Sequence, residues 1–171
     1  MSAVEIPNQT VEVLYSNHHG WLRGWLRKRL GNAFDAADLA HDTYVRVMVS
    51  GKIPGPEQSR SHLTQIANGL VIDLYRRRQL EAAYLEAIGL LPQGQVPSEE
   101  SRALVIEALV EVDTILHGLA PRARAALLLC RLDGLSYREI AAELGVSVSS
   151  VEKYIAAGLA ACYRAVHEPS H

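Results

Sequence analysis

The chain of 171 residues lacks several features that would assign it to a membrane, secreted or metal-binding class. It has no apolar run near the ~18 residues that a membrane span requires, and no charged-then-apolar segment at its start. We therefore expect a cytoplasmic protein with no signal peptide and no direct membrane insertion. Its two cysteines, Cys130 and Cys162, are far apart and form no C-x-x-C pair. Both are expected to be reduced, buried thiols.

The signatures of common catalytic and cofactor sites are also absent. No phosphate-cradling glycine loop, nucleophile elbow or H-E-x-x-H motif occurs. His18 and His19 are adjacent and so point to different faces of a helix, and His41 has no further ligands at helical spacing. Acidic residues around Asp35 are explained by the helix dipole alone. The sequence predicts no enzyme, no metal site and no cofactor.

Charge is low in total but uneven along the chain. The formal net charge is only −2, yet basic residues gather at two places and acidic residues in the middle. Each basic cluster is either a binding surface or a solvated helix end, which cations favour through the dipole. The clusters are Arg23, Arg27, Lys28 and Arg29; Arg76, Arg77 and Arg78; and, of opposite sign, Glu99, Glu100, Glu107, Glu111 and Asp113.

The stretch LSYREIAAELGVSVSSVEKYI, residues 135–155, has the pattern of two short helices joined by a tight turn. Ser136 and Glu139 have capping-box spacing, Gly145 can end the first helix, and Ser147 can cap the second. Small Ala141 falls where the helices would cross. This is the pattern of a helix-turn-helix, whose second helix enters the major groove of DNA. An ordinary helical hairpin is the plainer alternative.

In the second helix of this pair, an apolar face is predicted to pack and a polar face to point outward. The apolar set is Val148, Val151, Ile155 and Leu159, and the outward set is Ser149, Glu152, Lys153 and Ala156.

Helical periodicity continues through the rest of the chain, so the predicted fold is all-α. Asp35 is expected to cap a helix in which Met48 is one of the apolar positions and Asp42 pairs with Arg46. A later helix, ending before Pro121, is predicted to pack through a stripe that includes Val105, Leu109 and Val112. Proline and glycine between residues 89 and 101 indicate a flexible linker. The predicted organisation is a helical domain at 1–88, a linker at 89–101, and a domain with the helix-turn-helix at 102–171.

With these patterns in view, the chain resembles the extracytoplasmic-function group of the sigma-70 family. FDAADLAHDTYVRVMVS (34–50) is similar to regions 2.1–2.2, RSHLTQIANGLVIDLYRRR (60–78) to regions 2.3–2.4, and residues 112–165 to region 4. The segments YSNHHGWL, RVMVS, LEAAYLEAIGLLP and LGVSVSSVEKY are similar to ferric-citrate-type iron-starvation sigma factors. The chain departs from the family at Asn68-Gly69, where the family often has R-N, and at Glu152, where it often has Arg or Lys.

The resemblance implies a transcription initiation factor for iron-siderophore uptake genes. Its partners would be core RNA polymerase, promoter DNA and the cytosolic segment of a membrane-spanning anti-sigma regulator. The implied readers of the minus-thirty-five element are Arg138, Ser147, Val148, Ser149, Ser150, Glu152, Lys153, Tyr154 and Ala156. Those for the minus-ten element and promoter melting are Arg60, Gln65, Asn68, Gly69, Arg76, Arg77 and Arg78. Those for binding core polymerase are Asp38, His41, Asp42, Tyr44 and Arg46.

An acidic total charge is compatible with this role, because the polymerase can supply most of the attraction to phosphates while the sigma factor reads sequence. Two other classes remain open at this point. A free-standing helix-turn-helix regulator would bind its operator without polymerase. An enzyme acting on nucleic acid would need carboxylate or histidine sites that the sequence does not offer.

Overall fold

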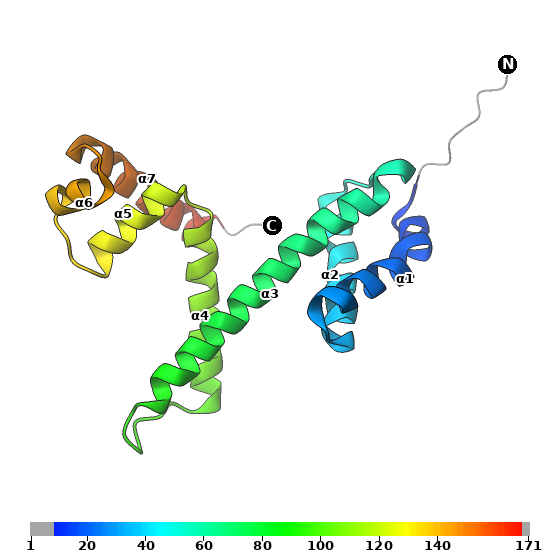
Figure 1. Cartoon of the computed structure of the whole chain (residues 1–171), viewed down its shortest axis with the longest axis horizontal. Coiled ribbons are helices and arrows are strands. Elements are labelled where there is room, and N and C mark those ends of the chain that lie inside the picture. Colours follow the sequence, from blue (N-terminus) through cyan, green and yellow to red (C-terminus); the bar gives the residue numbers. More distant parts are fainter. Residues whose placement is uncertain (1–8, 169–171) are drawn as a thin grey trace. The chain divides into compact units, whose positions relative to one another are not determined.

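A computed structural model describes residues 9–168. Over this range the chain forms seven α-helices and one short 3₁₀ helix, which confirms the predicted all-α fold (Figure 1). None of the helices in the described range is both long and apolar enough to cross a membrane. The helices are α1 (Val11–Leu30), α2 (Ala33–Ser50), α3 (Ser59–Gly89), α4 (Glu99–His117), α5 (Pro121–Arg131), α6 (Tyr137–Leu144) and α7 (Val148–His167), with the 3₁₀ helix at Pro56–Gln58.

The chain divides into two compact units, Met1–Gln79 and Leu80–His171, so the division falls inside α3. The predicted end of the first domain, residue 88, lies nine residues after this division, near the C-terminus of α3. That boundary stays a prediction. Within the expected linker, residues 90–98 are free of helix. Residues 99–101 already belong to α4, because the Ser98 hydroxyl accepts a hydrogen bond from the Ser101 backbone N–H at 3.2 Å and caps that helix.

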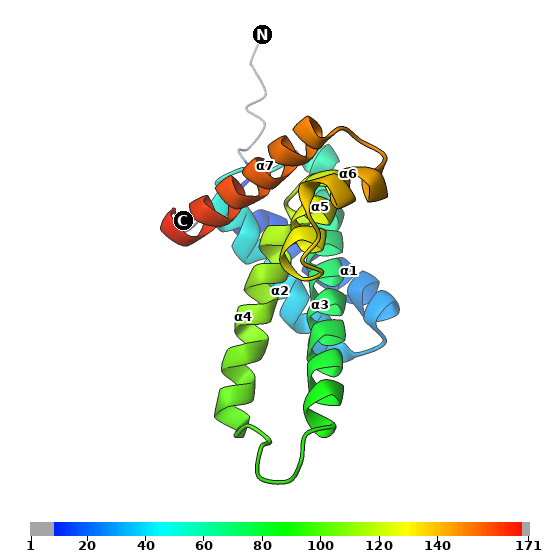
Figure 2. The same cartoon turned by 90° about the vertical axis from the view of Figure 1, so that its left-hand side faces the viewer.

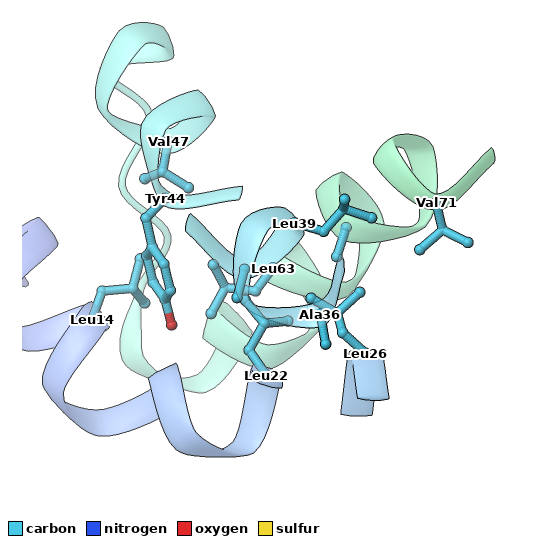
Figure 3. Packing of buried hydrophobic residues seen from close by; sticks show 11 residues of the cluster. Leu14, Leu22, Leu26, Ala36, Leu39, Tyr44, Val47, Leu63 and Val71 are labelled. Atoms are coloured by element: carbon cyan, nitrogen blue, oxygen red, sulfur yellow. The ribbon is translucent and has the colours of Figure 1, made fainter. Parts of the chain in front are cut away.

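The first unit is held by one apolar core to which α1, α2 and the start of α3 all contribute (Figure 3). Leu22 and Leu26 of α1, Val47 of α2 and Leu63 of α3 are completely buried. Leu22 and Leu26 are four residues apart, the spacing that places both side chains on one face of α1. Tyr44 lies in the same core, and its ring projects beside Leu14.

Three details of α2 differ from the sequence-based expectation. Its N-cap is Asn32, whose side-chain oxygen accepts from the Phe34 backbone N–H at 2.8 Å, and not Asp35. Met48 is 58% exposed and lies outside the core. No salt bridge joins Asp42 to Arg46 in the part of the chain that the structure describes. An exposed pair of this kind gains too little to hold two long side chains together.

The second unit has its core between α5, α6 and α7, with α4 packed against α5 and α7 (Figure 2). Cys130 and Cys162 lie at its margin as free thiols, and they are half-buried instead of buried as expected. The predicted packing stripe of α4 was wrong at three positions, although Leu116 and Leu119 of the same stripe do pack against the core. Val105, Leu109 and Val112 are exposed, whereas Ile106 on the neighbouring face is buried.

The helix-turn-helix is formed by α6 and α7, and its caps are those that the sequence predicted. The Ser136 backbone N–H donates to the Glu139 carboxylate at 2.7 Å, and the Glu139 N–H donates to the Ser136 hydroxyl at 3.3 Å. Gly145 adopts the left-handed conformation, with φ 63°, that ends α6. The Ser147 hydroxyl accepts from the Ser150 N–H at 3.1 Å and starts α7.

The rotation of α7 about its axis differs slightly from the prediction. Val151 and Ile155 are buried as expected, but Val148 and Leu159 are exposed. The buried face continues instead through Gly158, where a β-carbon would lie 3.1 Å from the Leu127 side chain of α5. Because a helix turns about 100° per residue, burying position 158 rotates position 159 toward solvent.

Replacing Gly158 by leucine is therefore expected to destabilise the second unit. The added side chain would overpack the contact with Leu127, at a cost of about 1–3 kcal/mol. Thermal unfolding followed by circular dichroism measures the effect. Ala160→Leu, an exposed change two residues later, should alter stability by no more than about 0.5 kcal/mol. Equal stability of the two variants would contradict the close approach of α5 and α7.

The capping box predicts a pH dependence of stability. Hydrogen bonds from the Ser136 backbone N–H and hydroxyl lower the pKa of Glu139 from its usual 4.5. A depressed folded-state pKa stabilises the fold above the unfolded value of 4.5, and this contribution disappears as the pH falls through the folded value. Glu139→Gln should therefore lower the melting temperature at pH 7 but not once the pH is well below 4.5.

Glu143→Gln is the matched control, because it removes an exposed carboxylate from the same helix outside the cap. Melting curves of both variants and the parent protein, recorded from acid to neutral pH, provide the comparison. A Glu139→Gln deficit that is independent of pH would show that the charged carboxylate contributes nothing to the cap.

Candidate nucleic-acid interface

The outward face of α7 contains four of the predicted reading residues. Ser149, Glu152, Lys153 and Ala156 are all exposed. Measured around the helix from the buried positions, Ser149 and Lys153 point most directly away from the core. Arg138 is exposed on α6, the preceding helix of the pair. The face is thus small and polar, and carries one cation.

The remaining predicted readers on α7 have other surroundings. The Ser147 and Ser150 hydroxyls lie 2.9 Å apart and hydrogen-bond to each other within the N-terminal cap. Tyr154 is half-buried and packs against the core of the second unit. Val148 is 39% exposed at the first position of α7, where its apolar side chain borders the polar face.

A helix end with this surface can enter the major groove of DNA, which admits an α-helix and exposes the edges of every base pair. Lys153 can donate to guanine O6 and N7, and Glu152 can accept from cytosine N4. Arg138 carries a charge suited to a phosphate. The cap matters for this use, because it fixes the first turn of α7, from which the reading side chains project.

The second predicted surface lies on α3, but its residues are spread around the helix, with Arg60 and Gly69 about 180° apart. Gln65 and Gly69 are exposed, and the Arg60 guanidinium lies over the Trp21 ring of α1 at 5.0 Å. Asn68 is half-buried, and its side-chain oxygen is buried with no hydrogen-bond partner among residues 9–168. Because that oxygen is buried, it is not accessible to a base in this arrangement of the helix.

The three consecutive arginines of α3 are not equivalent. Arg78 forms a salt bridge with Asp35 of α2 at 2.6 Å. Arg76 lies 3.6 Å from Asp73 on its own helix. Arg77 is exposed. Sequence reasoning missed the role of Asp35, because the pair joins residues 43 positions apart and leaves no local spacing signal.

The third predicted surface is the polar side of α2, where Asp38, His41, Asp42 and Arg46 are all exposed. Tyr44 does not belong to that surface, because it is only 4% exposed. Burial, together with nearby Tyr15, raises the pKa of the Tyr44 hydroxyl to about 12. Tyr44 therefore remains protonated and supports the packing of α1 on α2.

An apolar groove next to this polar side was not predicted. It has a volume of about 400 Å³ and lies between α1 and α2. Its lining includes His41 and the exposed Met48, which had been expected in the core. Nothing in the sequence distinguishes an apolar position that packs from one at the edge of a groove. The lining residues are Val11, Glu12, Tyr15, Ser16, His41, Tyr44, Val45 and Met48.

Comparison with protein families assigns both units. Residues 14–81 match Sigma-70 region 2, and residues 109–162 match Sigma-70, region 4. These ranges contain the α3 and α2 surfaces in the first case and the helix-turn-helix in the second.

Several curated proteins are similar over most of the chain. The ferric citrate uptake sigma factor FecI of Escherichia coli (strain K12) is 50% identical over 153 residues, which is 90% of this chain and 88% of that protein. The ECF RNA polymerase sigma factor SigE of Mycolicibacterium smegmatis is 34% identical over 137 residues, covering 75% of this chain and 50% of that protein. RNA polymerase sigma factor YlaC of Bacillus subtilis (strain 168) is 29% identical over 147 residues, 83% of either chain.

Among solved structures, a chain in the structure titled "1.8 A structure of RsbN-BldN complex" aligns over 91% of this chain and 90% of its own length. It is 20% identical with a TM-score of 0.33, which is too low a likeness to support an argument. The sequence relatives and the two matched regions do not favour a free-standing regulator. Together with the helix-turn-helix that the fold forms, they show that the chain belongs to the extracytoplasmic-function group of the sigma-70 family of transcription initiation factors.

Proposed function

We propose that this sigma factor directs core RNA polymerase to the promoters of genes for uptake of a ferric chelate. The observation that carries the choice of genes is the 50% identity, over 90% of the chain, to a sigma factor named for ferric citrate uptake. The likeness extends through both units, so it includes the surfaces expected to select a promoter as well as those expected to bind polymerase. The protein would act in the cytoplasm without a cofactor.

The second unit would read the upstream promoter element through α7. Lys153 and Glu152 suit a G·C-containing site, at about 1–3 kcal/mol for each good base contact. Arg138 would contact a flanking phosphate and fix the register without reading sequence. Ser147, Ser150 and Tyr154 would act mainly by holding α7 in place, since their side chains are engaged in the cap or the core.

The first unit would take the downstream element and its unpaired strand. Single-stranded DNA is bound by positive charge combined with surfaces on which a base can stack. The Arg60–Trp21 pair offers both, with the guanidinium 5.0 Å from the ring centre. Gln65, Asn68 and Gly69 lie farther along the same helix, and of these the exposed Gln65 side chain could hydrogen-bond to a base. Arg76, Arg77 and Arg78 would meet phosphates of the upstream duplex.

The polar side of α2 would bind core polymerase. Asp38, His41, Asp42 and Arg46 are exposed together on that helix, and the apolar groove that includes Met48 adjoins His41. A polar rim beside an apolar patch is the usual composition of a protein–protein interface. Tyr44 would contribute from inside, by fixing the position of α2 on α1.

We further propose control by the cytosolic segment of a membrane-spanning anti-sigma regulator. The similarity of the chain to ferric-citrate-type sigma factors is the ground for this partner. A regulatory segment could use apolar side chains on α4, where Leu104 is 68% and Val112 is 53% exposed.

Run-off transcription with purified core polymerase tests the function directly. Adding this protein should yield a transcript from a ferric-chelate uptake promoter and none from an unrelated promoter. Asp42→Lys should weaken core binding in a pull-down and reduce the transcript in proportion, because it reverses a charge in the docking surface. Glu86→Lys, an exposed charge reversal on α3 outside the proposed surfaces, serves as the control. If folded Asp42→Lys binds core polymerase normally, the assignment of polymerase binding to α2 is wrong.

A second test concerns base reading by α7. Lys153→Ala should reduce transcription from the cognate promoter about 5- to 150-fold, equivalent to about 1–3 kcal/mol, and relax preference at one base position. Arg138→Ala should weaken all promoters about equally and lower the salt dependence of binding. A panel of promoters with single base changes distinguishes the two. Equal losses across the panel for both variants would show that Lys153 contacts a DNA phosphate instead of a base.

A further inference from the structure

A small basic hollow in the first unit is not used by any of the surfaces above. It lies between the second half of α1 and the start of α2 and has a volume of about 270 Å³. Its position accounts for part of the first basic cluster of the sequence. The residues that line it are Gly20, Arg23, Gly24, Arg27, Ala33 and Ala36.

The hollow exists because small residues line it. Glycine inside a helix is unfavourable relative to alanine, so two glycines one turn apart in α1 require an explanation. Close packing is not that explanation, since a β-carbon at Gly20 or Gly24 would meet nothing within 4 Å. A larger side chain at either position would instead occupy the space of the hollow. The glycines keep that space open.

Arg23 and Arg27 give the hollow its charge. They are exposed, lie one turn apart on the same helix face, and engage in no salt bridge or side-chain hydrogen bond within residues 9–168. Two other arginines of the first unit are already engaged. Arg29 lies over the Trp25 ring at 5.1 Å, and Arg78 is paired with Asp35. Two guanidinium groups at this spacing present forked donors suited to the oxygens of one phosphate.

The surroundings favour a phosphate of DNA over an acidic surface of the polymerase. Asp35, the acidic residue next to Ala36, is already neutralised by Arg78 at 2.6 Å. The Tyr75 hydroxyl of α3 donates to the Arg29 carbonyl at 3.3 Å, so α3 reaches the same end of α1 just before its three arginines. Asp38 of the polymerase-docking surface lies about 200° around α2 from Ala36 and so faces another way.

We propose that the hollow formed around Arg23 and Arg27 binds a backbone phosphate of promoter DNA, extending the arginine-rich end of α3. The inference rests on the proposed function, because it assumes that the first unit meets promoter DNA. The site adds affinity and no sequence preference, since a phosphate is the same at every position. It also gives the protein a local cationic site despite its net charge of −2.

The test measures the salt dependence of promoter binding by the complete complex of core polymerase and full-length protein. Arg23→Gln/Arg27→Gln should lower the slope of log affinity against log salt by about 0.7–0.9, the value for one phosphate contact. The loss should be equal on cognate and base-substituted promoters. Lys28→Gln removes a neighbouring charge outside the hollow and should leave the slope unchanged.

A second pair of variants tests whether phosphate binding needs the open volume of the hollow, with the charge left unchanged. Gly24→Leu should reproduce the smaller slope by filling the hollow, whereas Gly24→Ala should retain most of the parental slope. Circular dichroism confirms that each variant is folded. Parental slopes for both the arginine double variant and Gly24→Leu would overturn the proposal.

Two further outcomes would assign the hollow to another partner and overturn the DNA assignment. One is a loss of core affinity in the double variant with an unchanged salt slope, which would indicate an acidic surface of the polymerase. The other is tight binding of inorganic phosphate, followed by tryptophan fluorescence, without any effect on DNA. If the parent protein itself gives no promoter-dependent transcript, the proposed function fails. If the parent protein gives the transcript but the variants keep the parental salt slope, the phosphate site is wrong and the proposed function stands.

Discussion

The contact between Gly158 of α7 and Leu127 of α5 determines what the second unit can present to DNA. Without a side chain at position 158, α7 approaches α5 closely, and the buried face runs through Val151, Ile155 and Gly158. Every other position of α7 is then assigned by the helical repeat. Lys153 and Ser149 face outward as a consequence of packing on the opposite side. The face of α7 proposed to read DNA therefore depends on a core contact on the opposite side of the helix.

In the first unit, too, contacts inside the fold determine which side chains remain exposed, but here polar contacts contribute as well as apolar ones. Its apolar core aligns three helices, and polar links between distant segments then fix their ends. The salt bridge of Arg78 with Asp35 and the hydrogen bond from Tyr75 to the Arg29 carbonyl connect the same region of α3 to α2 and α1. The arginines of this unit therefore have two different roles. Some arginines stabilise the unit, while Arg23 and Arg27 remain available to a ligand.

The local features of this fold could be predicted from sequence because they act over three or four residues. Ser136 with Glu139, Gly145 and Ser147 each have a spacing that dictates a cap or a turn, and the structure forms all of them. Features set by tertiary packing could not be predicted. The burial of glycine at 158 left no hydrophobic signal, so Val148 and Leu159 were wrongly placed in the core. Asn32 and Asp35 are both able to cap, and in the structure Asn32 caps α2 while Asp35 lies in its first turn and pairs with Arg78.

The salt bridge between Arg78 and Asp35 also affects the entropy of binding. A free arginine on a helix surface samples many rotamers, and ordering it on a ligand costs about 0.5–1.5 kcal/mol. Arg78 is already restrained by Asp35 at 2.6 Å, so most of that ordering takes place when the protein folds. Its guanidinium has five donors in a planar fork and does not use all of them on one carboxylate oxygen. The donors that remain are held in a fixed direction, so Arg78 would be preorganised for the proposed phosphate contact.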